Sequence, residues 1–222
     1  MHPGAEWRFA RWAALLLLIQ LMCGLGCAAP PDGALDVEAL EAQFEERARA
    51  VLRGGDALLP AAGSFALAAR PSRGGAAVAF PSDGSGAVRF DLPDGLGIEV
   101  RERGLQGEVQ RAGAALAYPR AGGFALWTAQ RHGAEEWLWF PEGAPAAGPL
   151  ASWQVEGALL RRRGANVEVL DAAGEPRIIV SAPEAYASPS RRVPTRLEVQ
   201  GDEISLWVEE TGSPLFVDPS WT

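Results

Sequence analysis

The chain has 222 residues, of which 48% are hydrophobic and 22% charged, and its mean hydropathy is close to zero. This composition is typical of a globular protein with a buried core and not of a disordered chain. Twenty basic residues, all of them arginine, stand against 28 acidic residues, and the net charge of -8 argues against an extended surface for nucleic acid. Two histidines and two cysteines leave few side chains for nucleophilic catalysis or metal binding.

Residues 1–26 have the pattern of a signal peptide. Arg8 and Arg11 precede an apolar run from Ala13 to Met22. This run is shorter than the about 20 apolar residues that a membrane-spanning helix needs. We therefore predict that the segment directs export and is removed from the mature protein.

Both cysteines stand at the end of this segment, at positions 23 and 27. The sequence Gly24-Leu25-Gly26-Cys27-Ala28 resembles the lipobox of bacterial lipoproteins, in which a small residue precedes the cysteine that is lipidated and becomes the mature N-terminus. The resemblance implies lipidation at Cys27 and a membrane anchor of two or three acyl chains. Ala28 after the cysteine implies delivery to the outer membrane, on its periplasmic or its surface side. The alternative is a secreted protein that carries no lipid.

Residues 27–35 are predicted to be a tether, and residues 36–54 an amphipathic helix. Acidic residues come early in this helix and arginines late, as the helix dipole favours. Its apolar side chains recur at helical spacing, at Val37, Leu40, Phe44, Ala48 and Val51. We expect this stripe to pack on the domain that follows. The alternative is a helix that binds a partner or lies on a membrane, although its acidic face disfavours a membrane surface.

The rest of the chain is predicted to be rich in β-strands. Residues 55–86 are rich in Gly, Ala and Pro, with short strands expected at 64–69 and 76–80. From residue 87 onward, apolar and polar residues alternate with the period of half-buried strands. Strands are expected at 88–92, 96–100, 135–140, 152–155, 158–162, 166–170, 177–180, 195–200, 204–209 and 214–217. We predict an all-β fold, an antiparallel β-sandwich over residues 87–222 with one N-terminal helix.

Seven aromatic side chains lie between Tyr118 and Trp153. In a strand at 135–140, alternation places Trp137 and Trp139 on one face and Leu138 and Phe140 on the other. Because both faces are apolar, we expect this strand to be central and buried on both sides. The alternative is a carbohydrate-binding surface formed by exposed rings of Trp137, Trp139 and Trp153.

Four short segments follow one another in an order that resembles that of a known domain. They are Glu135-Glu136-Trp137-Leu138, Val167-Glu168-Val169-Leu170-Asp171-Ala172-Ala173-Gly174, Ala182-Pro183 and Leu215-Phe216-Val217-Asp218-Pro219-Ser220-Trp221. This region, about residues 95–222, resembles the β-rich leader domain that precedes Kelch-like, FG-GAP and YD-type repeats in large bacterial cell-surface proteins. The resemblance implies a structural or interaction role and supplies no catalytic residues.

Few side chains are suited to catalysis. His132 stands alone at an expected hairpin tip, so we predict neither a hydrolase triad nor a metal site, and no cofactor. Adjacent acids on a strand point to opposite faces, but a pair formed by distant acids such as Glu99 and Glu136 is retained as a glycan-cleaving alternative. The cluster Arg161-Arg162-Arg163 is predicted to be a solvated strand end, the alternative being a site for lipid phosphate or polysaccharide carboxylates.

These observations favour a non-enzymatic lipoprotein of the cell envelope, whose β-sandwich supports or presents an interaction with a protein or polysaccharide. Nucleic acid is not an expected partner. The first alternative is a carbohydrate-binding module that uses exposed tryptophans, and the second is a glycan-active enzyme with a carboxylate pair.

Overall fold

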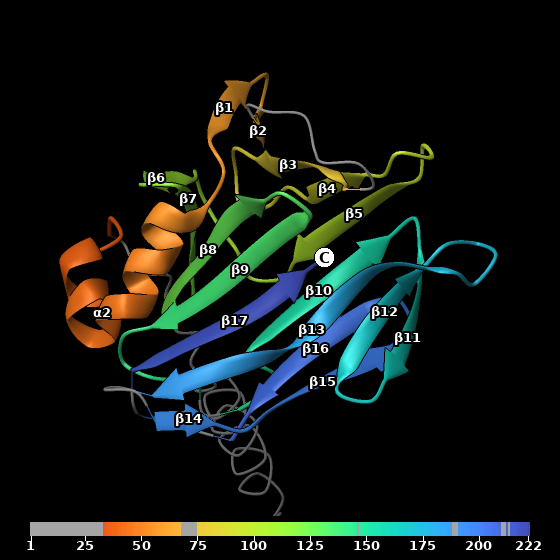
Figure 1. Ribbon diagram of the computed structural model, residues 1–222. Coiled ribbons are helices and arrows are strands. Elements are labelled where there is room, and N and C mark those ends of the chain that lie inside the picture. Colours follow the sequence, from red (N-terminus) through yellow and green to blue (C-terminus); the bar gives the residue numbers. More distant parts are fainter. Residues whose placement is uncertain (1–32, 68–74, 146, 188–190, 210–211, 213) are drawn as a thin grey trace, which may run out of the picture.

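The computed structural model describes residues 33–67, 75–145, 147–187, 191–209, 212 and 214–222. Two antiparallel β-sheets face each other, and a helix lies against the outside of one of them (Figure 1). The predicted all-β sandwich with one N-terminal helix is confirmed. The expected signal segment and Cys27 lie outside the described residues. Within these residues, no helix has the length and apolar character needed to cross a membrane.

The first sheet has eight strands among the described residues. Their spatial order is β1 (Leu58–Ala61), β2 (Ser64–Leu67), β3 (Ala77–Pro81), β4 (Val88–Asp91), β5 (Gly97–Glu102), β10 (Ala151–Glu156), β16 (Glu203–Val208) and β15 (Thr195–Gln200). Strands β1 to β3 come from the segment rich in Gly, Ala and Pro, which therefore adds strands to the same sheet as the region after residue 87.

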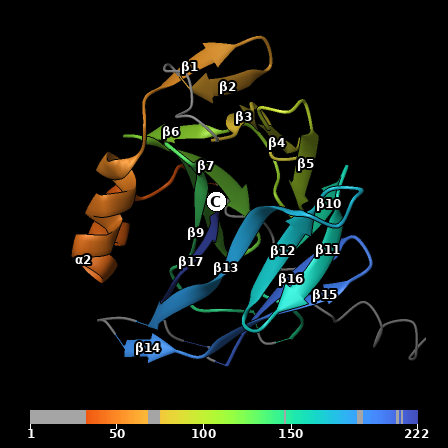
Figure 2. The same cartoon turned by 45° about the vertical axis from the view of Figure 1, so that its right-hand side comes forward.

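The second sheet contains the last strand of the chain, β17 (Leu215–Trp221), in a central position between β13 and β9 (Figure 2). The order of its other strands is β11 (Leu159–Arg163), β12 (Asn166–Leu170), β13 (Pro176–Ala187), then β17, then β9 (Gly133–Phe140), β8 (Gly123–Gln130), β7 (Ala115–Arg120) and β6 (Gln110–Ala112). A short strand, β14 (Arg191–Val193), pairs with the end of β13.

Strands β6, β7 and β8 occupy a region for which no strand was expected from the sequence. In β8, every residue from Gly123 to Ala129 is buried, and β7 is buried over most of its length. A strand that is covered on both faces shows no alternation of apolar and polar residues, so its period cannot be recognised. The same double burial, expected for residues 135–140, is confirmed in β9.

Between the sheets lies a core that is rich in large aromatic rings. Trp221, at the end of β17, is fully buried at its centre. Its ring centroid lies 6.2 Å from that of Trp127 on β8, 5.9 Å from that of Trp153 on β10 and 6.2 Å from that of Phe90 on β4. Side chains from both sheets thus meet around Trp221, and the last strand is part of the core that joins them.

Helix α2 (Val37–Gly54) covers the outer face of the second sheet. Leu40, Phe44, Ala48 and Val51 of the predicted apolar stripe are buried, and the Phe44 ring stacks on Phe216 of β17 at 5.2 Å. The expectation that the stripe packs on the following domain is confirmed. The stripe is therefore not free for a partner or a membrane, and that alternative is wrong.

Asp36 caps the N-terminus of α2, because its side chain accepts a hydrogen bond of 2.9 Å from the backbone N–H of Ala39. Replacement of Asp36 by alanine is expected to lower the free energy of unfolding by about 1 kcal/mol, since one N–H at the helix start loses its partner. Urea unfolding of the full chain measures this change. Asp36→Asn is the matched control, because asparagine caps as well as aspartate does; equal losses in both variants would contradict the capping role.

Candidate functional site

The three tryptophans considered for a carbohydrate surface are all buried. The exposed fraction is 7% for Trp137, 2% for Trp139 and 0% for Trp153. Trp137 and Trp139 lie beneath helix α2, whereas Trp153 lies between the sheets. The alternative of a platform of exposed rings is therefore wrong for these residues, and the expected core position is confirmed, because the helix covers one side of β9 and the first sheet covers the other.

The most unusual chemistry lies inside the sandwich, in three residues that we call the buried carboxyl cluster: Glu102, Arg120 and Glu136. Strand register places Glu136 of β9 opposite Trp127 of β8. It also places Glu102 of β5 opposite Trp153 of β10. All three members of the cluster are buried, and Glu136 is completely inaccessible to solvent.

Arg120 is the only cation of this cluster. Its Nη1 atom donates a hydrogen bond of 2.5 Å to Oε1 of Glu102, and its Nη2 atom donates one of 2.6 Å to the carbonyl oxygen of Leu150. The guanidinium also lies 4.9 Å from the ring centroid of Phe140. Arg120 of the second sheet thus forms an ion pair with Glu102 of the first, deep inside the sandwich.

Several polar atoms around this ion pair have no hydrogen-bond partner within the described residues. They are Oε2 of Glu102, Nε of Arg120, both carboxyl oxygens of Glu136 and the indole nitrogens of Trp127, Trp153 and Trp221. A buried polar atom without a partner costs about 1–3 kcal/mol. These unpartnered atoms therefore lower the stability of the folded protein, and a change in the ionisation of the buried carboxyl groups would change that stability.

Burial raises the pKa of Glu136 well above its usual value, and the nearby Glu102 carboxylate raises it further, while Arg120 opposes both effects. Burial also raises the pKa of Glu102, against the opposing charge of Arg120. One guanidinium cannot neutralise two carboxylates, and it is hydrogen-bonded to Glu102. We therefore assign the proton of the pair to Glu136 and the ion pair to Glu102 and Arg120.

This arrangement gives a substrate no route to the carboxyl pair. Glu136 is 0% exposed and Glu102 is 4% exposed. Glu99, the other acid considered as a partner of Glu136, lies in an outer groove of the first sheet beside Arg89, on the far side of β5 from the core. Glu99 and Glu136 therefore do not flank one cleft, which the glycan-cleaving alternative needs.

A second group of acids, which we call the outer acidic cluster, lies on the helix-covered face of the second sheet. It consists of Glu135, Glu184 and Asp218. Glu184 and Asp218 are register partners on β13 and β17. Burial raises the pKa of Asp218 to about 7, and the charges of Glu135 and Glu184 contribute. Glu184 accepts a hydrogen bond from the Tyr186 hydroxyl and forms an ion pair with Arg192 at 3.1 Å.

A metal role for these acids finds no support in the geometry. Within the described parts of the chain, no group of three His, Cys, Asp or Glu side chains is placed to hold a metal ion. Burial raises the pKa of Asp218, and the charges of Glu135 and Glu184 add a smaller contribution.

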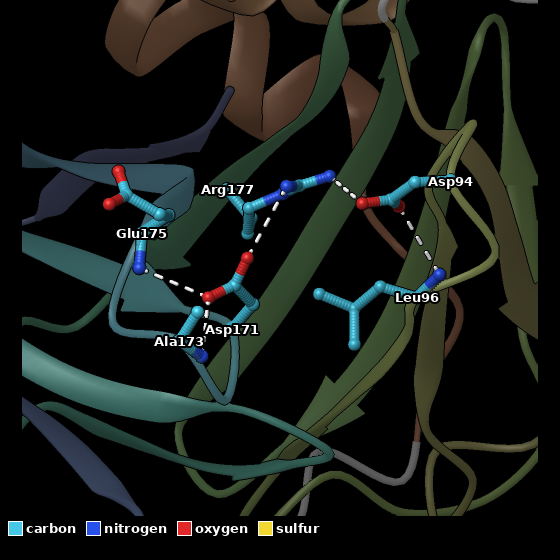
Figure 3. A network of polar contacts seen from close by, with 6 residues as sticks. All are labelled: Asp94, Leu96, Asp171, Ala173, Glu175 and Arg177. Carbon is cyan, nitrogen blue, oxygen red and sulfur yellow. Dashed lines mark hydrogen bonds and ion pairs between the residues drawn. The ribbon is translucent and has the colours of Figure 1, made fainter.

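Arg177 joins two turns, one from each sheet (Figure 3). Its guanidinium contacts Asp171, in the turn between β12 and β13, at 3.4 Å, and also contacts Asp94, in the turn between β4 and β5. Asp171 in turn accepts hydrogen bonds from the backbone N–H groups of Ala173 and Glu175, at 2.8 and 3.0 Å. The three charged residues connect the two sheets, and both carboxylates accept hydrogen bonds from within the chain. We therefore interpret the network as a structural link.

The arginine cluster on β11 is divided between the two faces of its strand. Arg161 and Arg163 both bind Glu168 of β12, at 2.6 and 2.7 Å, and lower the pKa of that carboxyl group. The side chain of Arg162 alternates with theirs, and its Nε donates to the carbonyl oxygen of Gly164 at 3.1 Å. Two of the three arginines thus bind the carboxylate of Glu168 on the neighbouring strand. This pairing was not predicted from the sequence.

Comparison with known proteins supplies no relative for this chain: no family model matches it, and neither a curated protein nor a solved structure does. The function must therefore be inferred from the residues and their geometry.

Proposed function

We propose that the protein is a non-enzymatic lipoprotein of the cell envelope, anchored through Cys27, whose β-sandwich serves as a structural or interaction module. It resembles in this role the leader domain of bacterial surface repeat proteins. The membrane is its first partner, reached through the acyl chains, and a protein or polysaccharide is its second. The outer membrane is the proposed location.

One observation carries the non-enzymatic part of the proposal. The carboxyl groups of Glu102 and Glu136, whose pKa values burial raises, are sealed in the core and cannot reach a bound substrate for general acid–base catalysis. They act on the stability of the sandwich instead. The alternative of a glycan-active enzyme would need an accessible carboxylate pair elsewhere.

The anchor rests on the sequence around Cys27. Two acyl chains hold a protein at a membrane durably, because each buried CH2 group contributes about 0.8 kcal/mol. The protein has a net charge of -8, which gives it no electrostatic attraction to an anionic lipid surface. Membrane association should therefore depend on lipidation alone.

Substitution of Cys27 by alanine is expected to move the protein from the membrane to the soluble fraction, with a loss of most of the membrane-bound material. Cys23→Ala is the matched control, since it removes the neighbouring thiol from the same segment and should leave partitioning unchanged. Fractionation of cells that express each variant measures the effect. Retention of Cys27→Ala in the membrane would contradict the anchor and favour another mode of attachment.

A further inference from the structure

Trp207 differs from every other tryptophan of the described chain. The five others, Trp127, Trp137, Trp139, Trp153 and Trp221, are buried, whereas Trp207 of β16 is partly exposed. Alternation along β16 turns Ile204 and Leu206 into the core and places Trp207 on the outer face of the first sheet. A large aromatic ring is thus kept at the surface, whereas the other described tryptophans are buried.

Trp207 borders a groove of about 450 Å³, a volume within the range of small-ligand sites, which is about 300–1,000 Å³. Its lining residues come from β11, β15 and β16. Strand β11 of the second sheet lies beside β15, at the edge of the first sheet (Figures 1 and 2). The residues that line the groove are Arg162, Glu198, Val199, Gln200, Ser205 and Trp207. Hydrogen-bond donors and acceptors therefore surround one aromatic ring.

The Trp207 ring is held in place by its neighbours on β15. Arg196, the register partner of Trp207, lies with its guanidinium 4.9 Å from the ring centroid. Glu198 accepts a hydrogen bond of 2.9 Å from Nε of Arg196 and so fixes that guanidinium over part of the ring. A ligand in the groove would then contact the part of Trp207 that borders it.

Arg162 supplies the positive charge among the residues that line the groove. Its two neighbours on β11 are bound to Glu168, but Arg162 points to the opposite face of the strand and into the groove. Among the described residues of this cluster, Arg161 and Arg163 bind a carboxylate, whereas the Nε of Arg162 donates to the carbonyl oxygen of Gly164. An arginine fork of this kind binds a carboxylate through two parallel hydrogen bonds.

We propose that this groove binds an acidic oligosaccharide, with Arg162 on a uronate carboxylate and Trp207 against the sugar ring. Gln200 and Ser205 both donate and accept hydrogen bonds, as vicinal hydroxyl groups require. This inference deepens the proposed function, on which it rests, by naming the chemistry of the second partner. It also places carbohydrate contact at a tryptophan that was not among the three considered from the sequence.

The test is a calorimetric titration of the full chain, purified in detergent, with oligogalacturonate and with its carboxyl-reduced, neutral counterpart. We expect binding of the acidic form and much weaker binding of the neutral one. Arg162→Gln should weaken binding about tenfold or more, because a hydrogen-bonded charge is lost. Trp207→Leu should weaken it by about threefold to tenfold, as expected for a lost aromatic contact.

Arg161→Gln is the matched control, because it removes the same charge from the same strand but outside the groove. Its affinity should stay within about twofold of the parent chain. The proposed binding site would be overturned by equal losses of affinity in both arginine variants, by equal binding of the neutral oligosaccharide, or by no binding at all. The last result would leave the lipoprotein proposal intact. Cleavage of the bound oligosaccharide would instead contradict the non-enzymatic role and leave the groove standing.

Discussion

Replacement of Arg120 by methionine is expected to lower the free energy of unfolding by about 3–5 kcal/mol at neutral pH, the usual cost of removing one partner from a buried ion pair. Arg120 is the cation that Glu102 contacts at 2.5 Å, and both side chains are buried. Without it, Glu102 must either remain charged in the core or take up a proton. The urea-unfolding midpoint of the full chain, with the slope compared between variants, measures this loss.

A second substitution separates lost charge from lost packing. The double variant Arg120→Met with Glu102→Gln removes both charges, so it should recover a large part of the stability lost in the single variant. Glu102→Gln alone should cost less than Arg120→Met, because it leaves a cation that still bonds the Leu150 carbonyl and lies over the Phe140 ring. A double variant that is no more stable than Arg120→Met would show that the guanidinium acts through packing and not through its charge.

The replacement of Asp218 by asparagine is expected to raise stability at pH 7 and above, and to leave it unchanged below about pH 4. The pKa of Asp218 is raised to about 7 in the folded protein, from a usual value of 3.8. The folded state therefore keeps a proton that the unfolded state loses between these pH values, and stability falls as the pH rises through this window. The gain at pH 7 should be roughly 2–4 kcal/mol, after allowance for partial solvent screening.

Unfolding curves recorded from pH 3 to pH 8 measure this difference. Ser220→Ala is a suitable control, since Ser220 follows Asp218 on the same face of β17 and carries no titrating group. The control should retain the pH dependence of the parent chain. If Asp218→Asn and the parent chain showed the same slope between pH 4 and pH 7, the acids around Asp218 would not couple to folding as their geometry implies.

Those parts of the fold with a periodic sequence could be predicted from it. The spacing of Leu40, Phe44 and Ala48 indicated a helix with one apolar face, and that face is buried against the second sheet. Alternation after residue 87 located strands such as β4 and β5, each with one face in the core. In both cases one side of the element faces solvent and the other the core, so apolar and polar residues alternate with the period of that element.

Elements covered on both sides were harder to recognise. Strands β7 and β8 carry apolar residues on both faces, and the sequence gives them no detectable period. Burial on both faces also makes the function of the tryptophans in β9 hard to infer from the sequence. A dense run of tryptophans is typical both of a ligand surface and of a core, and only the position of helix α2 shows that Trp137 and Trp139 belong to the core.

The buried carboxyl cluster was only partly accessible to sequence reasoning. Continuing the alternation of Ile98 and Val100 by two residues places Glu102 on the inner face of β5, a signal that was present but not used. Arg120 follows a proline at the end of β7, where no strand was recognised. The meeting of Glu102, Arg120 and Glu136 depends on how the two sheets face each other, which no local pattern specifies.

The mass of the mature protein recovered from membranes tests the proposed function most directly. A lipoprotein anchored through Cys27 should give a chain that begins at that cysteine and is heavier than its peptide mass by a diacylglyceryl group, with or without a further acyl chain. Treatment that releases acyl chains should remove the excess. A chain that retains residues 1–26, or one that begins near position 27 with an unmodified peptide mass, would contradict the anchor on which this account of the protein depends.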